Sequence, residues 1–250
     1  MYDTFAVVKE ICPILYEDQD LLAIDKPAGM LAIPDRWDTN VPVAQQLLQN
    51  QFGKLMPVHR IDKDTTGVLL YARNEAAHRI ISNDFSNRKV EKIYFAIVQG
   101  EPESDTWEVE LPLRPDGDRL HRTIIDASKG KEAKTRFEVI ERFRGFALVL
   151  AIPETGRTHQ IRVHLAASGL AIVADPLYGN GAPLLLSMLK AGWKGDAYEE
   201  RPLIDRTALH SAKVSFVHPK TKEGLIIEAP FPRDFKATLA QLRKVRTRWA

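Results

Sequence analysis

The stretch VHRIDKDTTGVLLYAR, residues 58–73, joins a charged segment to an apolar one. Ionisable side chains come first, among them those of His59, Arg60, Asp62 and Asp64. A glycine follows, and residues 68–72 then have the length and apolar character of a buried strand. An acid between basic residues at the start of a buried strand has two interpretations. It belongs to a solvated turn, where Asp and Thr are common, or it is the carboxylate of an active site.

Strands are predicted on both sides of this stretch. Upstream, residues 14–17 and 21–25 are apolar, and KPAG, residues 26–29, ends the second segment. Downstream, apolar runs or alternation predict strands within residues 92–100, 106–113, 133–143, 146–153, 208–219 and 224–230. Because strands outnumber helices and many connections are short, we predict an α+β fold with a mixed, largely antiparallel sheet and flanking helices.

Four helices are predicted around these strands. Their ranges are 41–52, 74–87, 156–169 and a basic amphipathic tail, 234–250. Asn74 is expected to cap the second, and Thr158 and Gly169 are expected at the two ends of the third. Residues 114–132 are polar and predict an exposed loop or hairpin, and residues 183–206 predict an irregular surface excursion.

Bulk composition fits a globular cytoplasmic protein. The chain has 250 residues, 44% of them hydrophobic and 27% charged, with a formal net charge of +2. Cys12 is the only cysteine, which excludes a disulfide or a thiolate metal cage within one chain. The N-terminus does not resemble a signal peptide, and no apolar segment has the length of a membrane span. We expect an N-terminal extension over 1–10, one catalytic domain over 11–235, and a C-terminal helix over 236–250 that packs on it.

Several familiar enzyme sites are not supported by the sequence. Neither a P-loop nor a G-x-S-x-G nucleophile motif is present. His159 and His164 are five residues apart, so they point about 140° apart on a helix, whereas a zinc pair on one helix needs a spacing of four. We therefore predict no metal site. A metal-dependent phosphoesterase using scattered His and Asp residues stays open as an alternative.

The segment GRTHQIR, residues 156–162, gathers polar side chains around a predicted helix start. Arg157, His159, Gln160 and Arg162 are all within it, and His159 and Arg162 share a helix face. Arginines and helix N-termini suit phosphate groups. The alternative is a solvated helix face with one arginine in a structural ion pair.

Taken together, five blocks of the chain resemble the RluA-type family of RNA pseudouridine synthases. They are ILYEDQDLLAIDKPAGMLAIP, HRID with DTTG, KIYFAIVQG, GRTHQIRVHLAASGLAIVADPLYG and ALHSAKVSFVHP, in the family's order and spacing over residues 11–235. The family's usual HRLD is HRID here and its TSG is TTG, and both changes conserve character. The stretch GMLAIPDR, residues 29–36, resembles the branch that includes ribosomal large subunit pseudouridine synthase A.

This resemblance implies a fold with a central catalytic cleft, an RNA substrate and no cofactor. The family's essential aspartate falls on Asp62 and its partner arginine on Arg162, which would keep the carboxylate ionised. Tyr94 matches a tyrosine that stacks on the base and assists removal of the C5 proton, and Leu209 matches an apolar residue that packs against the base. Arg60 matches a residue that fills the space left by the flipped nucleotide.

Substrate binding is expected to use further side chains from the same blocks. To Arg60 and Leu209 we add His59, Arg157, His159 and Gln160. The expected partner of this monomer is a stem-loop of ribosomal or transfer RNA, with no DNA and no membrane. A non-catalytic RNA-binding protein on the same fold, in which Asp62 is only a turn residue, is the second alternative.

Two groups of basic residues are predicted to grip the RNA backbone. The loop group is Arg119, His121, Arg122, Lys129, Lys131 and Lys134, and the tail group is Arg243, Lys244, Arg246 and Arg248. Phosphate contacts of this kind position an RNA without reading its sequence. The alternative for the tail is a helix that packs on the domain with a solvated basic face.

Overall fold

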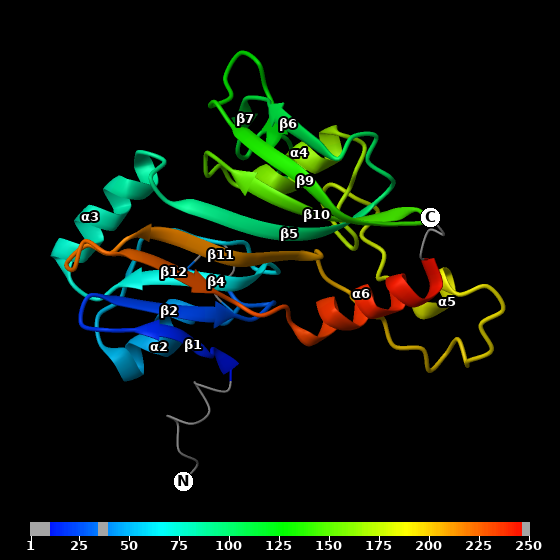
Figure 1. Ribbon diagram of the computed structural model, residues 1–250, viewed down its shortest axis with the longest axis horizontal. Coiled ribbons are helices and arrows are strands. Elements are labelled where there is room, and N and C mark those ends of the chain that lie inside the picture. Colours follow the sequence, from blue (N-terminus) through cyan, green and yellow to red (C-terminus); the bar gives the residue numbers. More distant parts are fainter. Residues whose placement is uncertain (1–10, 35–39, 247–250) are drawn as a thin grey trace, which may run out of the picture. The chain divides into compact units, whose positions relative to one another are not determined.

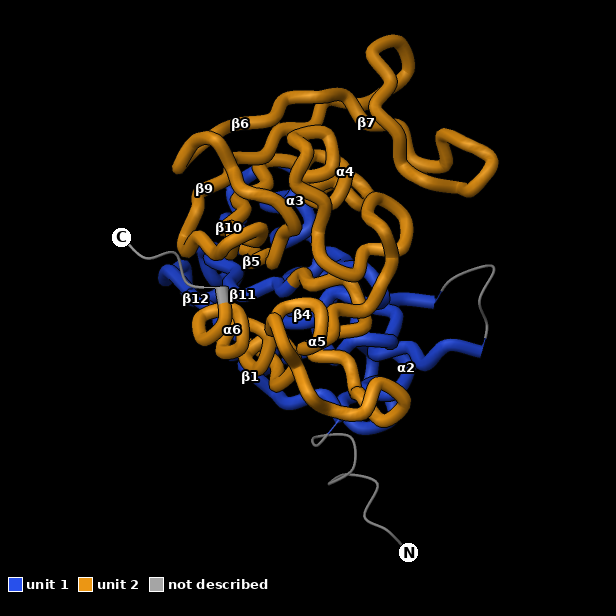
Figure 2. The backbone as a smooth tube through the Cα atoms, turned by 90° about the vertical axis from the view of Figure 1, so that its right-hand side faces the viewer, with its two compact units in different colours: residues 1–93, 210–230 blue, residues 94–209, 231–250 orange. Residues whose placement is uncertain are grey.

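The computed structural model describes residues 11–34 and 40–246. These residues form two compact units, which Figure 2 shows in two colours. Unit 1 contains the chain up to residue 93 together with 210–230, and unit 2 contains 94–209 together with the chain from 231 onward. The range expected to be one domain, 11–235, therefore contributes to both units.

Unit 1 is built on a mixed sheet (Figure 1). Its strands are β1 (Ile14–Glu17), β2 (Leu21–Lys26), β3 (Met56–Pro57), β4 (Thr66–Ala72), β11 (Leu209–Val217) and β12 (Gly224–Glu228). β4 pairs antiparallel with β2 and β3 and parallel with β11, whereas β1–β2 and β11–β12 are antiparallel pairs. The helices described in full in this unit are α2 (Ala44–Phe52) and α3 (Glu75–Ser86).

β4 is the centre of this unit, since all seven of its residues are buried. A strand covered on both faces reads as a continuous apolar run, which is why residues 68–72 lack alternation. Asn74 ends the turn that follows, and its side chain accepts a hydrogen bond from the backbone N–H of Ala77. The predicted cap of α3 is thus confirmed.

Unit 2 is built on an antiparallel sheet. Along it lie β5 (Glu91–Gln99), β10 (Phe146–Pro153), β9 (Lys134–Phe143) and β6 (Thr106–Glu110), each paired antiparallel with the next. A two-stranded hairpin, β7 (Leu113–Arg114) and β8 (Ile124–Ile125), occupies the polar segment predicted as a loop or hairpin. The α+β class and the mixed, largely antiparallel pairing are confirmed.

Three helices belong to unit 2. α4 (Gln160–Ala167) lies against β9 and β10, and the short α5 (Leu186–Leu189) lies against α6 (Arg233–Arg246). α5 is the one helix that the structure describes within the excursion over 183–206, which is otherwise irregular as predicted. Thr158 was the wrong N-cap for α4, because His159 has a left-handed backbone (φ 55°) and the helix begins one residue later.

The tail helix α6 is packed within its unit. Phe235, Leu239 and Leu242 are buried. At its start, Arg206 Nε lies 2.7 Å from a carboxylate oxygen of Asp234. Of the predicted tail cations, Arg248 lies outside the described residues. Among the described residues, no helix is both long and apolar enough to cross a membrane.

Candidate active site

Asp62 lies in a tight turn between buried Ile61 and the start of β4. The backbone N–H of Thr65 donates to the carbonyl of Asp62 at 3.1 Å. Thr65 and Thr66 are buried, while Asp62 itself is half-buried. The turn therefore anchors the backbone on its apolar side and leaves the carboxylate partly accessible.

A buried lysine supports the turn of Asp62 through hydrogen bonds to backbone carbonyls. Lys26, at the end of β2, has no exposed surface, and its Nζ donates to the carbonyls of Pro27, Met30 and Lys63 at 2.7, 2.8 and 2.9 Å. A buried ammonium is tolerated only where hydrogen bonds satisfy it. The contact with Lys63 fixes the residue next to Asp62. The KPAG stretch was predicted only as a strand end, and this function of Lys26 was not predicted.

The other end of the turn is held by a buried histidine. His210 Nδ1 and the Thr66 hydroxyl are 2.9 Å apart, and His210 Nε2 lies 3.2 Å from the carbonyl of Ala229. Because a carbonyl can only accept, Nε2 carries the proton and Nδ1 accepts from Thr66. His210 directly follows Leu209, which is buried at the start of β11.

His59 has a structural contact of its own. Its Nε2 accepts a hydrogen bond from the backbone N–H of Leu70 at 3.0 Å, and its ring stacks on Phe85 with centroids 4.9 Å apart. Burial, assisted by the charge of Lys92, lowers the pKa of His59 to about 3. The imidazole is thus neutral at ordinary pH. Arg60, in contrast, is exposed and has no hydrogen-bond partner among the described residues.

In unit 2, Arg162 makes a buried two-pronged ion pair. Its Nε and one terminal nitrogen lie 2.7 and 2.8 Å from the two carboxylate oxygens of Asp175. The Arg162 side chain is 7% exposed and that of Asp175 is fully buried. Burial alone would raise the pKa of Asp175, but Arg162 and the backbone N–H groups of Leu177 and Tyr178 lower it. Both charges are therefore maintained.

Tyr178 extends this ion pair into a network. The guanidinium carbon of Arg162 lies 5.1 Å from the centre of the Tyr178 ring, a cation–π distance. The Tyr178 hydroxyl accepts from the backbone N–H of Thr123 at 2.9 Å and shares a 2.9 Å hydrogen bond with His159 Nδ1. Asp175 and Tyr178 belong to DPLYG, residues 175–179, so this block supports the arginine of the preceding helix.

Gln160 has its whole amide engaged within unit 2. Its Oε1 accepts from the Thr155 hydroxyl and the Arg157 N–H, and its Nε2 donates to the Lys134 carbonyl and the Thr135 hydroxyl, all within 2.7–3.0 Å. Arg157 Nε donates to the carbonyl of Glu132 at 2.9 Å. These contacts favour support of the helix start, and an RNA contact of Gln160 or Arg157 stays a prediction.

Tyr94 is buried on β5, opposite Ala151 of β10. It belongs to unit 2 with Arg162, whereas Asp62 belongs to unit 1. The predicted pairing of Asp62 with Arg162, and the central cleft that would need both units, stay predictions. Asp175 is a partner of Arg162 that the sequence analysis missed, although an acid in a block following an arginine helix was a usable signal.

Comparison with known proteins identifies the chain. The family model described as RNA pseudouridylate synthase matches residues 20–167. An uncharacterised RNA pseudouridine synthase of Bacillus subtilis, YlyB, is 37% identical over 242 residues, which cover 92% of this chain and 73% of that protein. The ribosomal large subunit pseudouridine synthase C of Vibrio vulnificus is 36% identical, covering 93% and 70%. The chain belongs to the RNA pseudouridylate synthase family.

A solved structure agrees with this family. The human RNA pseudouridylate synthase domain containing 1 has a TM-score of 0.67 and 26% identity, covering 88% of this chain and 84% of that one. The protein is therefore an RNA pseudouridine synthase, an isomerase that acts on RNA, as the resemblance of the sequence blocks implied. The relatives named here do not test the branch suggested by residues 29–36, part of which lies outside the described residues.

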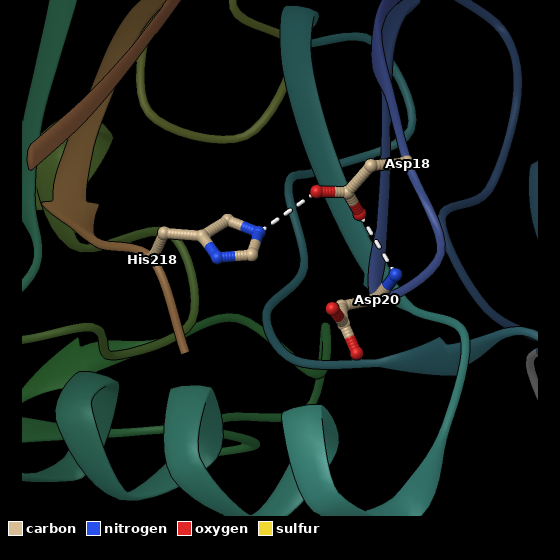
Figure 3. A group of neighbouring side chains, drawn as sticks. All are labelled: Asp18, Asp20 and His218. Atoms are coloured by element: carbon tan, nitrogen blue, oxygen red, sulfur yellow. Dashed lines mark hydrogen bonds and ion pairs between the residues drawn. The ribbon is translucent and has the colours of Figure 1, made fainter. Parts of the chain in front are cut away.

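The metal-dependent alternative has one cluster to consider in this synthase. Among the described residues, only Asp18, Asp20 and His218 bring three ligand-type atoms within 4.8 Å of one another (Figure 3). His218 Nδ1 accepts from the backbone N–H groups of Lys220 and Thr221, so its Nε2 carries the proton and donates to Asp18 at 2.8 Å. A protonated nitrogen is not a ligand.

The carboxylate oxygens of Asp18 are likewise engaged in hydrogen bonds. Its two oxygens accept from the Tyr16 hydroxyl, His218 and the backbone N–H groups of Asp20 and Leu21. Burial opposes ionisation, yet these hydrogen bonds lower the pKa of Asp18. The cluster holds the β1–β2 turn to the end of β11, and it gives no support to a metal-dependent phosphoesterase.

Proposed function

We propose that this synthase converts one uridine of structured ribosomal RNA into pseudouridine, with Asp62 as the essential carboxylate. The observation that carries the proposal is the turn of Asp62, anchored from one side by Lys26 and from the other by His210 through Thr66. A partly accessible acid on a fixed backbone suits covalent or electrostatic catalysis. The relative from Vibrio vulnificus is named for the large ribosomal subunit, which supports ribosomal over transfer RNA.

The reaction breaks the bond between C1′ and N1 of uridine and forms one between C1′ and C5. The base turns in between, C5 loses its proton, and N1 gains one, so the product is an isomer of the substrate. The Asp62 carboxylate acts at C1′ or at C6, or promotes a glycal intermediate. Each route needs an ionised acid, and Arg162, itself held by Asp175, is the proposed counter-charge.

Other side chains are proposed to hold the base. Tyr94 stacks on the uracil and assists removal of the C5 proton, and Leu209 packs against the base. A stacked base must leave its helix before such chemistry, and exposed Arg60 is proposed to fill the space it leaves. Any contact of His59 would have to be made by a neutral ring, because its pKa is about 3.

The RNA backbone is proposed to lie along the β7–β8 hairpin. Several basic residues in the hairpin or after it already have acidic partners: Arg122 pairs with Asp118, His121 with Asp116, and Lys134, at the start of β9, with Glu108 and Glu154. Arg119, Lys129 and Lys131 are exposed and have no ion-pair partner among the described residues. These three cations are the better candidates for phosphate contacts with a stem-loop. The enzyme is proposed to act as a monomer in the cytoplasm.

A neighbouring acid provides a matched test of this function. Asp62→Asn should abolish tritium release from RNA that contains 5-tritiated uridine, because an amide cannot replace the carboxylate, while RNA binding is kept. Asp64→Asn changes the same turn and should keep most of the activity. Mapping pseudouridine in ribosomal RNA from cells with each variant identifies the target. Turnover by Asp62→Asn near the wild-type rate would contradict the proposal, and RNA binding with no turnover by the wild type would favour a non-catalytic protein.

A further inference from the structure

Unit 2 contains a cavity that the proposed chemistry does not use. Its volume is about 300 Å³, and it lies between the end of β5, the β9–β10 turn and the first part of the excursion over 183–206. Pockets for small ligands begin at about this volume, which suits one nucleobase with its sugar. The segments that form it are far apart in sequence.

The inner wall of the cavity is apolar. Val173 and Leu184 are buried there, Phe146 is half-buried, and Met188 is 53% exposed although it is a large apolar side chain. Leu184 is fixed by two backbone hydrogen bonds of 2.8 Å, one with Ile204 and one with Leu203, which close the base of the excursion. An aromatic ring and a thioether beside buried aliphatic groups form a surface on which a flat ring can stack.

The rim of the cavity is polar in a way that suits a nucleotide. Gln99 and Asn180 are exposed on it, and Asn180 Nδ2 lies 3.5 Å from Gln99 Oε1, which leaves the Nε2 of Gln99 without a partner among the described residues. An amide can pair with the donor and acceptor edge of a base. Arg144 is exposed at the same rim, also with no ion-pair partner in the described part of the chain, and offers a charge to a phosphate.

The cavity is separate from the place where Tyr94 would hold the target base. Gln99 is five residues beyond Tyr94 on β5, a distance of about 17 Å along a strand. The lining of the cavity is nevertheless continuous in sequence with the residues that hold Arg162. Ala174 lines the cavity with a left-handed backbone (φ 56°), which is unfavourable for a residue with a Cβ, and the next residue is Asp175.

We propose that this cavity binds a second, unpaired nucleotide of the substrate RNA. The base enters between Phe146 and Met188, the Gln99 amide meets its polar edge, and Arg144 contacts its phosphate. This inference rests on the proposed function, because sequence-specific recognition of RNA reads unstacked bases in loops. A nucleotide bound here would select RNAs that present two unpaired bases at a fixed separation.

The first experiment measures steady-state kinetics on an unmodified transcript of large-subunit ribosomal RNA. Ala182, an exposed residue of the cavity lining, is replaced by Trp to fill the space and by Ser as a control. Ala182→Trp should raise the KM for RNA about tenfold and leave kcat within twofold, since the reacting base is bound elsewhere. Ala182→Ser should match the wild type. Equal KM values for all three proteins would overturn the proposal.

The second experiment distinguishes the base contact from the phosphate contact. It measures the salt dependence of RNA binding and does not require turnover. Arg144→Gln should lower the slope of log affinity against log salt by about 0.7, the value for one contact with single-stranded RNA. Ala182→Trp should weaken binding without changing that slope, and Arg136→Gln, which removes an exposed arginine outside the cavity, should change neither. An unchanged slope for Arg144→Gln would overturn the phosphate contact.

Binding of a nucleotide in the cavity can be observed directly by NMR of labelled methionine methyl groups. The chain has four methionines, of which Met188 lines the cavity and Met56 lies on β3 of unit 1. Uridine monophosphate and adenosine monophosphate, added up to high millimolar concentrations, should shift the Met188 signal and leave Met56 in place. A Met188 shift with ribose 5-phosphate alone, or no shift with either nucleotide, would overturn base binding. If the wild-type protein formed no pseudouridine in the transcript, that result would count against the proposed function and not against nucleotide binding in the cavity.

Discussion

At the scale of single residues, the site contains side chains whose partners determine their charge. Arg162 is the clearest case, because it satisfies a fully buried carboxylate. The sequence pointed to Arg162 by resemblance, but the acid in the block that follows, Asp175, became a recognisable partner only when the folded chain brought the two together. Lys26 was also missed, since the carbonyls of Pro27, Met30 and Lys63 that accept its hydrogen bonds are backbone groups and carry no sequence signal.

Arg162→Met should reduce both stability and activity. It leaves Asp175 buried without its cation, and breaking such a pair typically costs about 3–5 kcal/mol. The free energy of unfolding is measured by urea denaturation and the rate by single-turnover tritium release. The double variant Arg162→Met with Asp175→Asn should regain part of the stability, since no unpaired charge remains, but none of the activity. A double variant with restored activity would show that Arg162 serves only to support Asp175.

His59 predicts a specific loss of stability in acid. The pKa of His59 in the folded protein, about 3, is below the ordinary value of 6.5. Between these two pH values the ring is protonated in the unfolded chain and neutral in the folded one. The stability due to the neutral ring is complete above pH 6.5 and declines as the pH falls toward 3, with a limiting slope of about 1.4 kcal/mol per pH unit. His59→Gln keeps an acceptor for Leu70 and should unfold with a shallower pH dependence. Parallel curves for the two proteins would contradict this assignment.

At the scale of elements, local rules predicted most strands and helices and failed where side chains from elsewhere intervene. Asn74 capped α3 as expected because the cap is made by neighbours in sequence. Thr158 did not cap α4, because His159 has a left-handed backbone and the helix begins only at Gln160. The segment of β7 and β8 was predicted only as an exposed loop or hairpin, without its strands, since strands of two residues leave almost no periodic pattern.

Gly67 shows how an element contact constrains one residue. It has φ +106°, and a Cβ added there would lie 2.1 Å from the carbonyl oxygen of Ser211, its partner on the parallel strand β11. Gly67→Ala should therefore destabilise the protein by roughly 3 kcal/mol or more. Gly224→Ala is the control, because that glycine also lies at the start of a strand segment, as the first residue of β12 where Gly67 is the second of β4, and has nothing within 4 Å of the added atom. Thermal unfolding of both variants checks this, and a similar midpoint for the two would contradict it.

At the scale of the whole molecule, the chain forms two units while the blocks that mark the family are distributed over both. Composition and periodicity predicted the fold class, because apolar runs and alternation mark most of the strands of both units. Composition and periodicity could not predict where the two units begin and end. The unit boundaries at residues 93, 209 and 230 fall inside or beside strands whose sequences are continuous. The same limit applies to the site, whose proposed acid and arginine belong to different units.

Recognition of RNA is predicted to depend on the hairpin more than on the tail. In the tail helix, Arg243 makes three hydrogen bonds with Glu141, the shortest at 2.8 Å. The apolar face of α6 is buried, which favours the alternative of a packed helix with a basic outer face. Arg119 lies within the hairpin and Lys129 and Lys131 follow it, and none of the three has an acidic partner among the described residues.

Neutralising these three residues to Gln should therefore weaken binding to all RNAs. The slope of log affinity against log salt should fall by roughly 2, at about 0.7–0.9 for each lost phosphate contact. The matched tail variant, Arg243→Gln with Lys244→Gln, should change the slope by less than about one. Filter binding from low to high salt measures both, and pseudouridine mapping should find the same target uridine in each case. A larger change in slope from the tail than from the hairpin would reverse the assignment, since it would mean that RNA displaces Glu141 from Arg243.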